Sequence, residues 1–213
     1  MVKAVIFDFD GTLADSFKLV VEITQGLTHR TEPISDLEIA RLRQMRLMNV
    51  AKELGLSRWR WPLLIIRGRR LMARRIGEVQ PFAGIEDVLR ALSEDHYRLF
   101  VMSSNSTRNV QVFLVQHGLS SYFTNIYGGV GLLGKSRALR RILQRNHLQS
   151  EDVIYVGDEP RDIEACKRVD VPCVAVAWGF NAPELLAEHA PMVVVRTSLQ
   201  LRKVLEEWGS SLV

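Results

Sequence analysis

Two carboxylates lie close together near the start of the chain, directly after an apolar run. The segment Asp8-Phe9-Asp10-Gly11-Thr12-Leu13 follows Val2 to Phe7. Carboxylates act in proteins as nucleophiles, as general acids and bases, and as ligands of hard dications. Two such charges side by side repel each other unless a cation or a shared proton compensates them. The pair therefore indicates chemistry, and the structural alternative is an Asp-Gly turn or a helix cap.

Further polar residues follow two later apolar runs and open one predicted helix. Ser103-Ser104-Asn105 follows the first of these runs, and Gly157-Asp158-Glu159-Pro160-Arg161-Asp162 follows the second. Lys135 lies between these two segments, where a helical pattern begins. Open α/β sheets bind their ligands at the carboxyl ends of the strands. We therefore expect these side chains to meet the first carboxylate pair at one edge of a sheet.

Six short apolar runs predict the strands of that sheet. They are Val2 to Phe7, Arg98 to Ser103, Ile126 to Tyr127, Val153 to Val156, Val174 to Ala177 and Met192 to Val195. Runs without strict alternation are typical of parallel strands that are covered on both faces. Helical segments alternate with the strands, and the first has apolar residues at Ile85, Val88, Leu89 and Leu92, the spacing of one helix face. The pattern predicts an α/β fold with a doubly wound parallel sheet.

Residues 16–80 interrupt this pattern with helical sequence and a concentration of positive charge. They contain 13 Lys and Arg against 6 Asp and Glu, a net charge of +7, whereas the whole chain carries +4. No convincing strand pattern occurs there, and Pro81 and Gly84 mark the return to the alternating pattern. We expect an α/β core of residues 1–15 and 81–213 with an inserted helical cap of residues 16–80.

The composition of the 213 residues, 47% hydrophobic and 24% charged, is typical of a folded globular protein. No apolar run approaches the roughly 20 residues that span a bilayer, so no membrane partner is expected. Cys166 and Cys173 are the only cysteines, which argues against a disulfide framework and a cysteine-ligated zinc site and favours the cytoplasm. Trp59 and Trp61 could stack on bases, but packing contacts are more common for tryptophan, and a nucleic-acid partner is not expected.

These motifs, taken in order, resemble the haloacid dehalogenase superfamily, in the branch of phosphatases related to phosphoglycolate phosphatase. Asp8 and Asp10 match the family's first motif, and Ser103 matches its second. Lys135 matches the third, and the fourth is matched by Asp158 together with Asp162. The resemblance covers essentially the whole chain and implies a Rossmann-like core whose helical cap follows the first strand.

The resemblance also implies a mechanism of phosphate ester hydrolysis. Asp8 would attack phosphorus and form an aspartyl phosphate, which splits one difficult displacement into two. Asp10 would protonate the departing oxygen and later accept a proton from the attacking water. The implied substrate is a small phosphate monoester, and phosphoglycolate is a candidate by resemblance alone.

A cation is required on this view, because several carboxylates would otherwise repel the phosphate. Magnesium is the implied ion. The resemblance assigns to it the Asp8 carboxylate, the Asp10 backbone carbonyl and Asp158, with Asp162 acting through water. Lys135 would balance the charges of the nucleophile and the phosphate. The residues expected to hold the phosphoryl oxygens are Gly11, Thr12, Ser103 and Ser104.

Two alternatives remain open from the sequence. The segment Gly129-Val130-Gly131-Leu132-Leu133-Gly134-Lys135-Ser136 fits a phosphate-binding P-loop, and Ile154 to Glu159 resembles the strand that accompanies it. This interpretation leaves Asp8 and Asp10 without a role. The second alternative is a nonenzymatic regulatory or binding module on the same scaffold, which the intact carboxylates and Lys135 disfavour.

The positive charge of residues 16–80 suggests a substrate that carries a second anionic group. Arg43 and Arg46 are the candidates for recognising it, because they flank Met45 in the middle of the predicted cap. Arg67, Arg70 and Arg74 recur on one helical stripe, which is typical of a solvated face.

Overall fold

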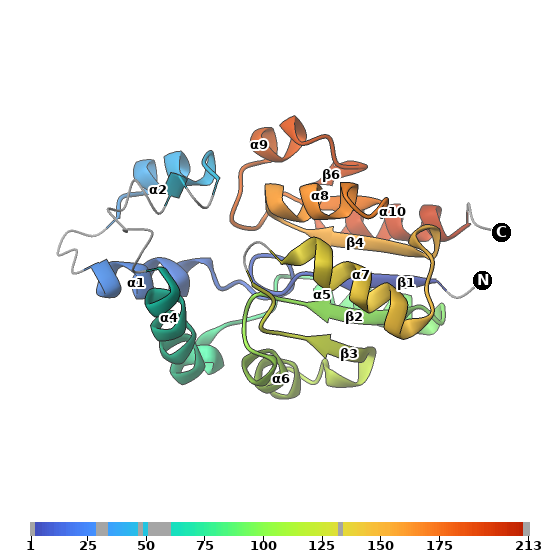
Figure 1. Cartoon of the computed structure of the whole chain (residues 1–213), viewed down its shortest axis with the longest axis horizontal. Helices are drawn as coiled ribbons and strands as arrows, with labels where there is room; N and C mark the ends of the chain where they lie inside the picture. Colours follow the sequence, from blue (N-terminus) through green and yellow to red (C-terminus); the bar gives the residue numbers. More distant parts are fainter. Residues whose placement is uncertain (1–2, 29–33, 47–48, 51–60, 132–133, 211–213) are drawn as a thin grey trace.

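The core of the structure is a single sheet of six parallel strands (Figure 1). The computed structural model describes residues 3–28, 34–46, 49–50, 61–131 and 134–210. The strands are β1 (Ala4–Phe7), β2 (Arg98–Met102), β3 (Phe123–Tyr127), β4 (Val153–Gly157), β5 (Cys173–Val176) and β6 (Val193–Val195). Their order is β3-β2-β1-β4-β5-β6, and every neighbouring pair is parallel. The predicted doubly wound α/β fold is confirmed.

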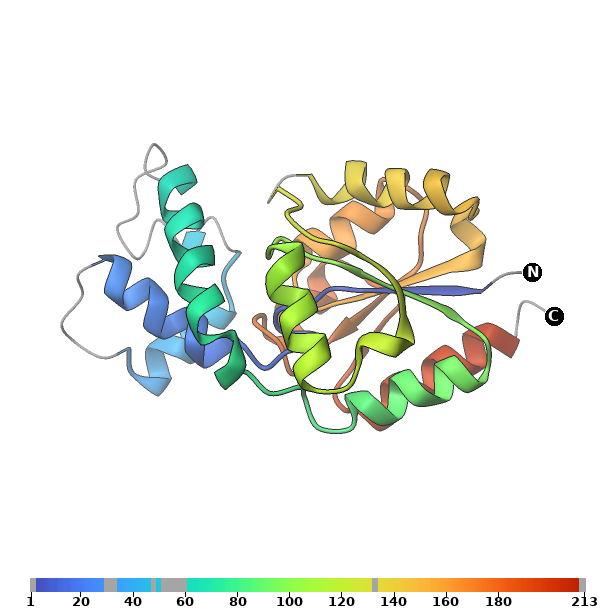
Figure 2. The same cartoon turned by 90° about the horizontal axis from the view of Figure 1, so that it is seen from below.

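Helices cover both faces of the sheet because the buried strands are apolar on both sides (Figure 2). These helices are α5 (Ile85–Glu94), α6 (Thr107–Gln116), α7 (Lys135–Asn146), α8 (Pro160–Lys167), α9 (Pro183–Glu188) and α10 (Ser198–Ser210). Val5 and Phe7 of β1 point into the cluster formed with α5, α6 and α10, whereas Ala4 and Ile6 point into the cluster with α7, α8 and α9. This alternation is the two-residue period of a strand.

The order of the strands places β1 beside β4 at the centre of the sheet. Strand order reverses between these two strands, since β2 and β3 lie on one side of β1 while β5 and β6 lie beyond β4. A reversal of this kind opens a crevice at the carboxyl ends of the two strands. Asp8 follows β1 and Asp158 follows β4, so both carboxylates lie at this crevice.

One predicted strand is longer in the structure than the sequence indicated. The apolar pair Ile126 and Tyr127 predicts only the end of β3, which begins at Phe123. Thr124 and Asn125 are exposed because β3 is an edge strand, and their polarity hides the strand from a search for apolar runs.

The described part of residues 16–80 is helical and contains no strand (Figure 1). Its elements are α1 (Phe17–Thr28), α2 (Asp36–Arg43), α4 (Trp61–Arg75) and the short 3-10 helix η2 (Ile76–Glu78). These elements, which we call the helical insert, lie beyond one end of the sheet in both views. Ala14 pairs with Pro81, and the Asp15 N–H donates to the Gln80 carbonyl at 2.8 Å, so the chain enters and leaves the insert side by side. The boundaries at residues 16 and 80 stay a prediction.

The arginine stripe of α4 faces solvent, as expected: Arg67, Arg70 and Arg74 are all exposed, and Met72 is buried on another side. Trp59 lies outside the described residues. Among the helices that the structure describes, none combines the length and apolar character needed to cross a bilayer.

Candidate active site

The loop after β1 holds Asp8 and turns the chain sharply at Gly11. The N–H groups of Leu13 and Ala14 both donate to the Phe9 carbonyl at 3.0 Å, which closes the turn. Gly11 has φ +81°, a left-handed conformation that disfavours other residues. A Cβ at Gly11 would lie 2.2 Å from Oδ2 of Asp158, so glycine also permits the loop to approach that carboxylate.

Asp158 and Asp162 are held by the end of β4 and the first turn of α8. Asp162 accepts the Glu159 N–H at 3.1 Å in a capping box and accepts the Tyr155 hydroxyl at 3.1 Å. A carboxylate in the first turn of a helix is also favoured by the helix dipole. Asp158 accepts the Thr12 hydroxyl at 3.0 Å and the Phe180 N–H at 2.7 Å. Each carboxylate therefore has a fixed orientation.

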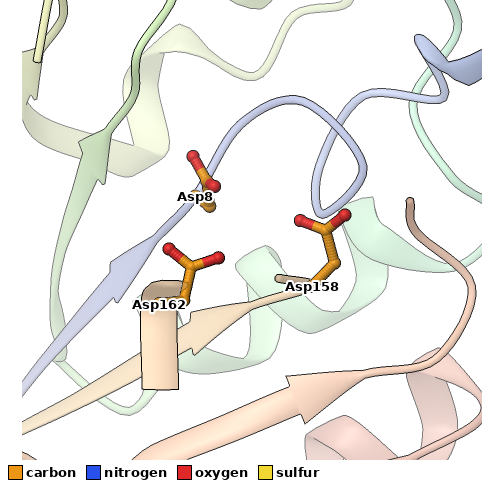
Figure 3. A group of neighbouring side chains, drawn as sticks. All are labelled: Asp8, Asp158 and Asp162. Atoms are coloured by element: carbon orange, nitrogen blue, oxygen red, sulfur yellow. The ribbon is translucent and has the colours of Figure 1, made fainter. Parts of the chain in front are cut away.

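Three carboxylates converge at this edge of the sheet (Figure 3). Asp8, Asp158 and Asp162 are buried, and an oxygen atom of each lies within 4.8 Å of the others. Asp8 lies 150 residues before Asp158 in the sequence, and the β1–β4 pairing brings it to Asp158 and Asp162. A set of oxygen donors of this kind is the arrangement that binds Mg²⁺ or a similar hard cation.

Lys135, the first residue of α7, is the cation that contacts this cluster directly. Its Nζ donates to Asp8 at 2.5 Å and forms a second ion pair with Asp162. Its side chain is only 3% exposed. Burial lowers the pKa of Lys135, but the two carboxylates raise it more, so the ammonium stays charged.

Burial dominates the acidity of the carboxyl groups. It raises the pKa of Asp8 to about 7, although Lys135 lowers it. Burial and the neighbouring negative charges of Glu159 and Asp8 raise the pKa of Asp158 well above its usual value. A bound cation would reverse both effects by favouring the charged carboxylates.

The charge balance of the site fits a divalent cation. Its five carboxylates are Asp8, Asp10, Asp158, Glu159 and Asp162, and its two cations are Lys135 and Arg161. With all of them ionised, three negative charges are uncompensated. Asp158 accepts hydrogen bonds but forms no ion pair with a described residue. It is therefore the carboxylate that a metal ion would compensate most.

Asp10 lies outside the three-carboxylate cluster and has different partners. Its carboxylate accepts the Ser16 hydroxyl at 2.8 Å and the Asn105 amide at 3.1 Å. Burial raises the pKa of Asp10, and these two hydrogen bonds lower it only in part. A carboxyl group that is protonated more readily than usual suits a general acid.

Comparison with known proteins decides between the alternatives. Residues 5–176 match the family of haloacid dehalogenase-like hydrolases. The chain is 37% identical over 201 residues to a phosphoglycolate phosphatase of Synechococcus elongatus, covering 93% of this chain and 95% of the relative. The chain belongs to the haloacid dehalogenase-like hydrolases. It is a phosphatase of that family.

Two further similarities agree with this family. The chain is 27% identical over 210 residues to a phosphoglycolate phosphatase of Pseudomonas savastanoi pv. phaseolicola, covering 91% of this chain and 76% of the relative. A crystal structure of a predicted phosphatase from Clostridium acetobutylicum superimposes with a TM-score of 0.82. That structure is 23% identical and covers 97% of this chain and 99% of its own, so it supports the fold alone.

The family assignment accounts for Lys135 without a P-loop. Lys135 is paired with Asp8 and Asp162, both of which the P-loop interpretation leaves unused. Leu132 and Leu133 of that motif lie outside the described residues. The nonenzymatic alternative is likewise not supported for a haloacid dehalogenase-like hydrolase that retains these side chains.

The remaining residues predicted to bind phosphate follow β1 and β2 in the chain. Ser103 is fully buried at the end of β2, and its Oγ accepts the Asn105 N–H at 2.9 Å. The Ser104 carbonyl accepts Nη2 of Arg69 at 2.5 Å. Thr12 contacts Asp158 through its hydroxyl, as described above. Their roles toward phosphate stay predictions.

Arg43 and Arg46 do not face the three-carboxylate cluster as free cations. Nη2 of Arg43 donates to the Gly179 carbonyl at 2.8 Å and to the Ala177 carbonyl at 3.3 Å. Arg46 forms an ion pair with Glu164 of α8 at 3.3 Å. These contacts could not be predicted from the sequence, because the acceptors lie more than 100 residues away and two of them are backbone carbonyls.

Several residues of this haloacid dehalogenase-like site had no role assigned to them from the sequence, although Asn105, Glu159 and Arg161 belong to the polar segments noted there. Ser16 and Asn105 hold Asp10, and Arg161 forms a buried pair with Glu159. Asn105 follows the Ser103-Ser104 motif directly, and that proximity was the available signal. Among the described atoms, Nε and Nη1 of Arg161 are buried without a hydrogen-bond partner.

Proposed function

We propose that this phosphatase is a Mg²⁺-dependent enzyme in which Asp8 is the nucleophile. Asp8 lies at the end of β1 with its carboxylate fixed by Lys135 on one oxygen and by the Phe9 N–H at 2.8 Å on the other. Attack on phosphorus would give an aspartyl phosphate and release the alcohol, and water would then hydrolyse the acyl phosphate. The single observation that carries this proposal is the contact of Lys135 with Asp8 beside the Asp158 carboxylate.

Asp10 is the proposed general acid and base. Its raised pKa favours the protonated form that can donate to the leaving oxygen, and the resulting carboxylate can accept a proton from water in the second step. The Ser16 and Asn105 donors stabilise that carboxylate and hold its direction. Asp8 and Asp10 thus divide the two roles through their different surroundings.

The proposed metal ligands are Asp8, Asp158 and the backbone carbonyl of Asp10. When bound, the ion would neutralise the carboxylates and the phosphoryl oxygens. Asp162 would contact the ion through water, since it already pairs with Lys135 and caps α8. Lys135 would keep Asp8 ionised and stabilise the charge of the phosphoryl group as it is transferred.

Phosphoglycolate is the proposed substrate, on the strength of the relative from Synechococcus elongatus. It is a small phosphate monoester with a second anion, the class suggested by the net charge of residues 16–80. The structure gives Arg43 and Arg46 other partners, so recognition of the carboxylate by these two residues stays a prediction. A cytoplasmic location is also proposed, supported by two buried free cysteines, Cys166 and Cys173.

The direct experiment is phosphate release from phosphoglycolate and from an aryl phosphate, with and without Mg²⁺. Asp8→Asn should abolish release from both substrates, because an amide cannot form the acyl phosphate. Asp170→Asn is the matched control: Asp170 is exposed, and asparagine accepts its φ of +55° equally well. Normal turnover of Asp8→Asn, or full activity of the wild type after metal removal with EDTA, would contradict the proposal.

A further inference from the structure

The loop between β5 and α9 contacts both the carboxylate cluster and the helical insert. We call residues Ala177–Ala182 the bridging loop. Gly179, Asn181 and Ala182 are buried, although the loop joins a strand to a helix at the edge of the sheet. Loops that join a strand to a helix are usually exposed, so the burial of the bridging loop shows that both the core and the helical insert pack against it.

On the side of the site, the bridging loop fixes Asp158. The Phe180 N–H donates to Oδ2 of Asp158 at 2.7 Å. Nε1 of Trp178 donates to the Thr12 carbonyl at 3.2 Å, and the Thr12 hydroxyl in turn donates to Oδ1 of Asp158 at 3.0 Å. A Cβ at Gly179 would lie 2.3 Å from Cβ of Asp158, so the loop also confines this side chain by direct contact.

On the side of the insert, the bridging loop forms hydrogen bonds with the end of α2. Nδ2 of Asn181 donates to the Arg43 carbonyl at 3.1 Å and to the Met45 carbonyl at 3.0 Å, and the Ala182 N–H donates to the Arg43 carbonyl at 2.9 Å. The last carbonyls of a helix have no partner inside the helix, so Asn181 caps α2 from the core. The Arg43 side chain in turn donates to the carbonyls of Gly179 and Ala177 in the bridging loop, as described above.

Aromatic packing extends this junction to α1. The rings of Phe17 and Phe180 lie 5.4 Å apart, and the Arg43 guanidinium lies 5.9 Å from the centre of the Phe17 ring. Phe180 therefore contacts the insert with its side chain and Asp158 with its backbone N–H. A shift of either partner would be transmitted to the other through one residue.

The junction also borders a cavity. This cavity has a volume of about 320 Å³, with Arg43, Ala177, Ala182 and Arg196 among its lining residues. The hydrogen bonds of Asn181 and Arg43 join α2 to the core beside this cavity.

We propose that Asn181 and Arg43 are positioning residues that couple docking of the helical insert to the orientation of Asp158, and hence to metal binding. With the insert docked, the bridging loop presents the Phe180 N–H to one oxygen of Asp158, and its Trp178 holds Thr12, whose hydroxyl donates to the other oxygen. With α2 detached, the loop loses its outer support and Asp158 loses its fixed direction. Because such coupling is reciprocal, a bound metal ion also stabilises the docked insert. The inference rests on the proposed function for the metal site.

The test measures Mn²⁺ binding to the full chain by isothermal titration calorimetry, without substrate. Asn181→Ala should weaken Mn²⁺ binding roughly 3- to 10-fold, the loss expected when hydrogen bonds that orient a ligand are removed. Asn146→Ala is the matched control, since Asn146 also donates two side-chain hydrogen bonds, to Tyr127 and Ile142, but lies at the far end of α7. Equal binding by wild type and Asn181→Ala would overturn the coupling.

Asp158→Asn separates this inference from the proposed function. If the wild type fails to bind Mn²⁺, or Asp158→Asn binds it as the wild type does, the proposed metal site is contradicted. The proposed coupling is then contradicted as well. If Asp158→Asn loses binding while Asn181→Ala retains it, only the coupling is wrong.

A second readout avoids dependence on one variant. Hydrogen exchange of the α2 amides should slow when Mn²⁺ binds to the wild type, and this protection should be lost in Arg43→Met, which removes the contacts to the bridging loop. Arg67→Met is the control, because Arg67 is exposed. Exchange of α2 that does not respond to Mn²⁺ in the wild type would also overturn the proposal.

Discussion

Asp10 differs from Asp8 in the donors that surround its carboxylate. Asp8 has the Lys135 ammonium, whereas Asp10 has one hydroxyl and one amide, from Ser16 and Asn105. Burial raises the pKa of both carboxyl groups, and a metal ion bound at Asp8 would favour the charged form there, whereas the donors to Asp10 are neutral. This difference in surroundings is the basis of the separate roles that we propose for the two carboxylates.

The Ser16 hydroxyl provides a test of that difference. Ser16→Ala removes a donor to the carboxylate form of Asp10, so the pKa of Asp10 should rise further. A general acid with a higher pKa stays protonated to higher pH, and the alkaline limb of kcat/KM should move up by roughly 0.5–1 pH unit. The profile is measured with Mg²⁺ saturating at every pH, and Ser210→Ala on the far helix α10 is the control. An alkaline limb that stays in place or moves down would contradict the role of Asp10.

The motif residues with a direct chemical signature could be predicted from sequence, and their supporting residues could not. Asp8, Lys135 and Asp158 stand at strand or helix ends, where type and position together indicate chemistry. Asn181 and Arg43 show no such signal, because their partners are backbone carbonyls whose position depends on the tertiary fold. The placement of Arg43 against the bridging loop follows from that fold alone.

At the level of elements, the turn after β1 brings the loop that carries Asp8 against the end of β4. Gly11→Ala would add a Cβ 2.2 Å from Asp158 Oδ2 at a φ of +81°. We expect activity to fall at least about 100-fold, since small displacements of catalytic groups have effects of that size. The change is measured as kcat/KM for phosphate release.

Gly118→Ala is a matched control for this variant. Gly118 also has a positive φ, +69°, but nothing lies within 4 Å of the added Cβ. Both variants should therefore lose about 1 kcal/mol of folding stability from backbone strain, while only Gly11→Ala loses activity. Equal activity of the two variants would show that the approach of Gly11 to Asp158 is unimportant.

The elements of the core were largely predictable because each buried strand is apolar on both sides. The β3 edge strand was predicted too short, since Thr124 and Asn125 face solvent. No periodicity in the sequence predicted the contact of α2 with the bridging loop. The packing between the insert and the core could therefore be known only from the structure.

At the level of the whole molecule, the buried carboxylates of the site should lower the free energy of unfolding when no cation is bound. Burial raises the pKa of Asp8 from 3.8 to about 7, so the folded protein binds this proton more tightly than the unfolded chain does. The contribution of Asp8 is thus most favourable below about pH 4 and is lost as the pH rises through 7. Without metal, we expect the free energy of unfolding to fall through this contribution between about pH 4 and about pH 7.

Urea unfolding with and without Mg²⁺ tests this expectation. Mg²⁺ at about 100 times its dissociation constant should add roughly 2.7 kcal/mol to the free energy of unfolding at pH 8, and much less at pH 5, where protons compete for the carboxylates. Asp158→Asn should raise stability without metal and abolish the Mg²⁺ effect. A urea midpoint that Mg²⁺ leaves unchanged at pH 8 would be incompatible with a metal site in this cluster.

The most direct measurement concerns the covalent bond that Asp8 is proposed to form. The enzyme is mixed with phosphoglycolate and Mg²⁺, quenched in acid during turnover and reduced with borohydride, which converts an aspartyl phosphate to homoserine, and the peptides are analysed by mass spectrometry. We expect the conversion at position 8, dependent on substrate and absent after Asp8→Asn. Modification at another carboxylate, or none at any carboxylate while phosphate is being released and the intermediate is kinetically populated, would contradict it.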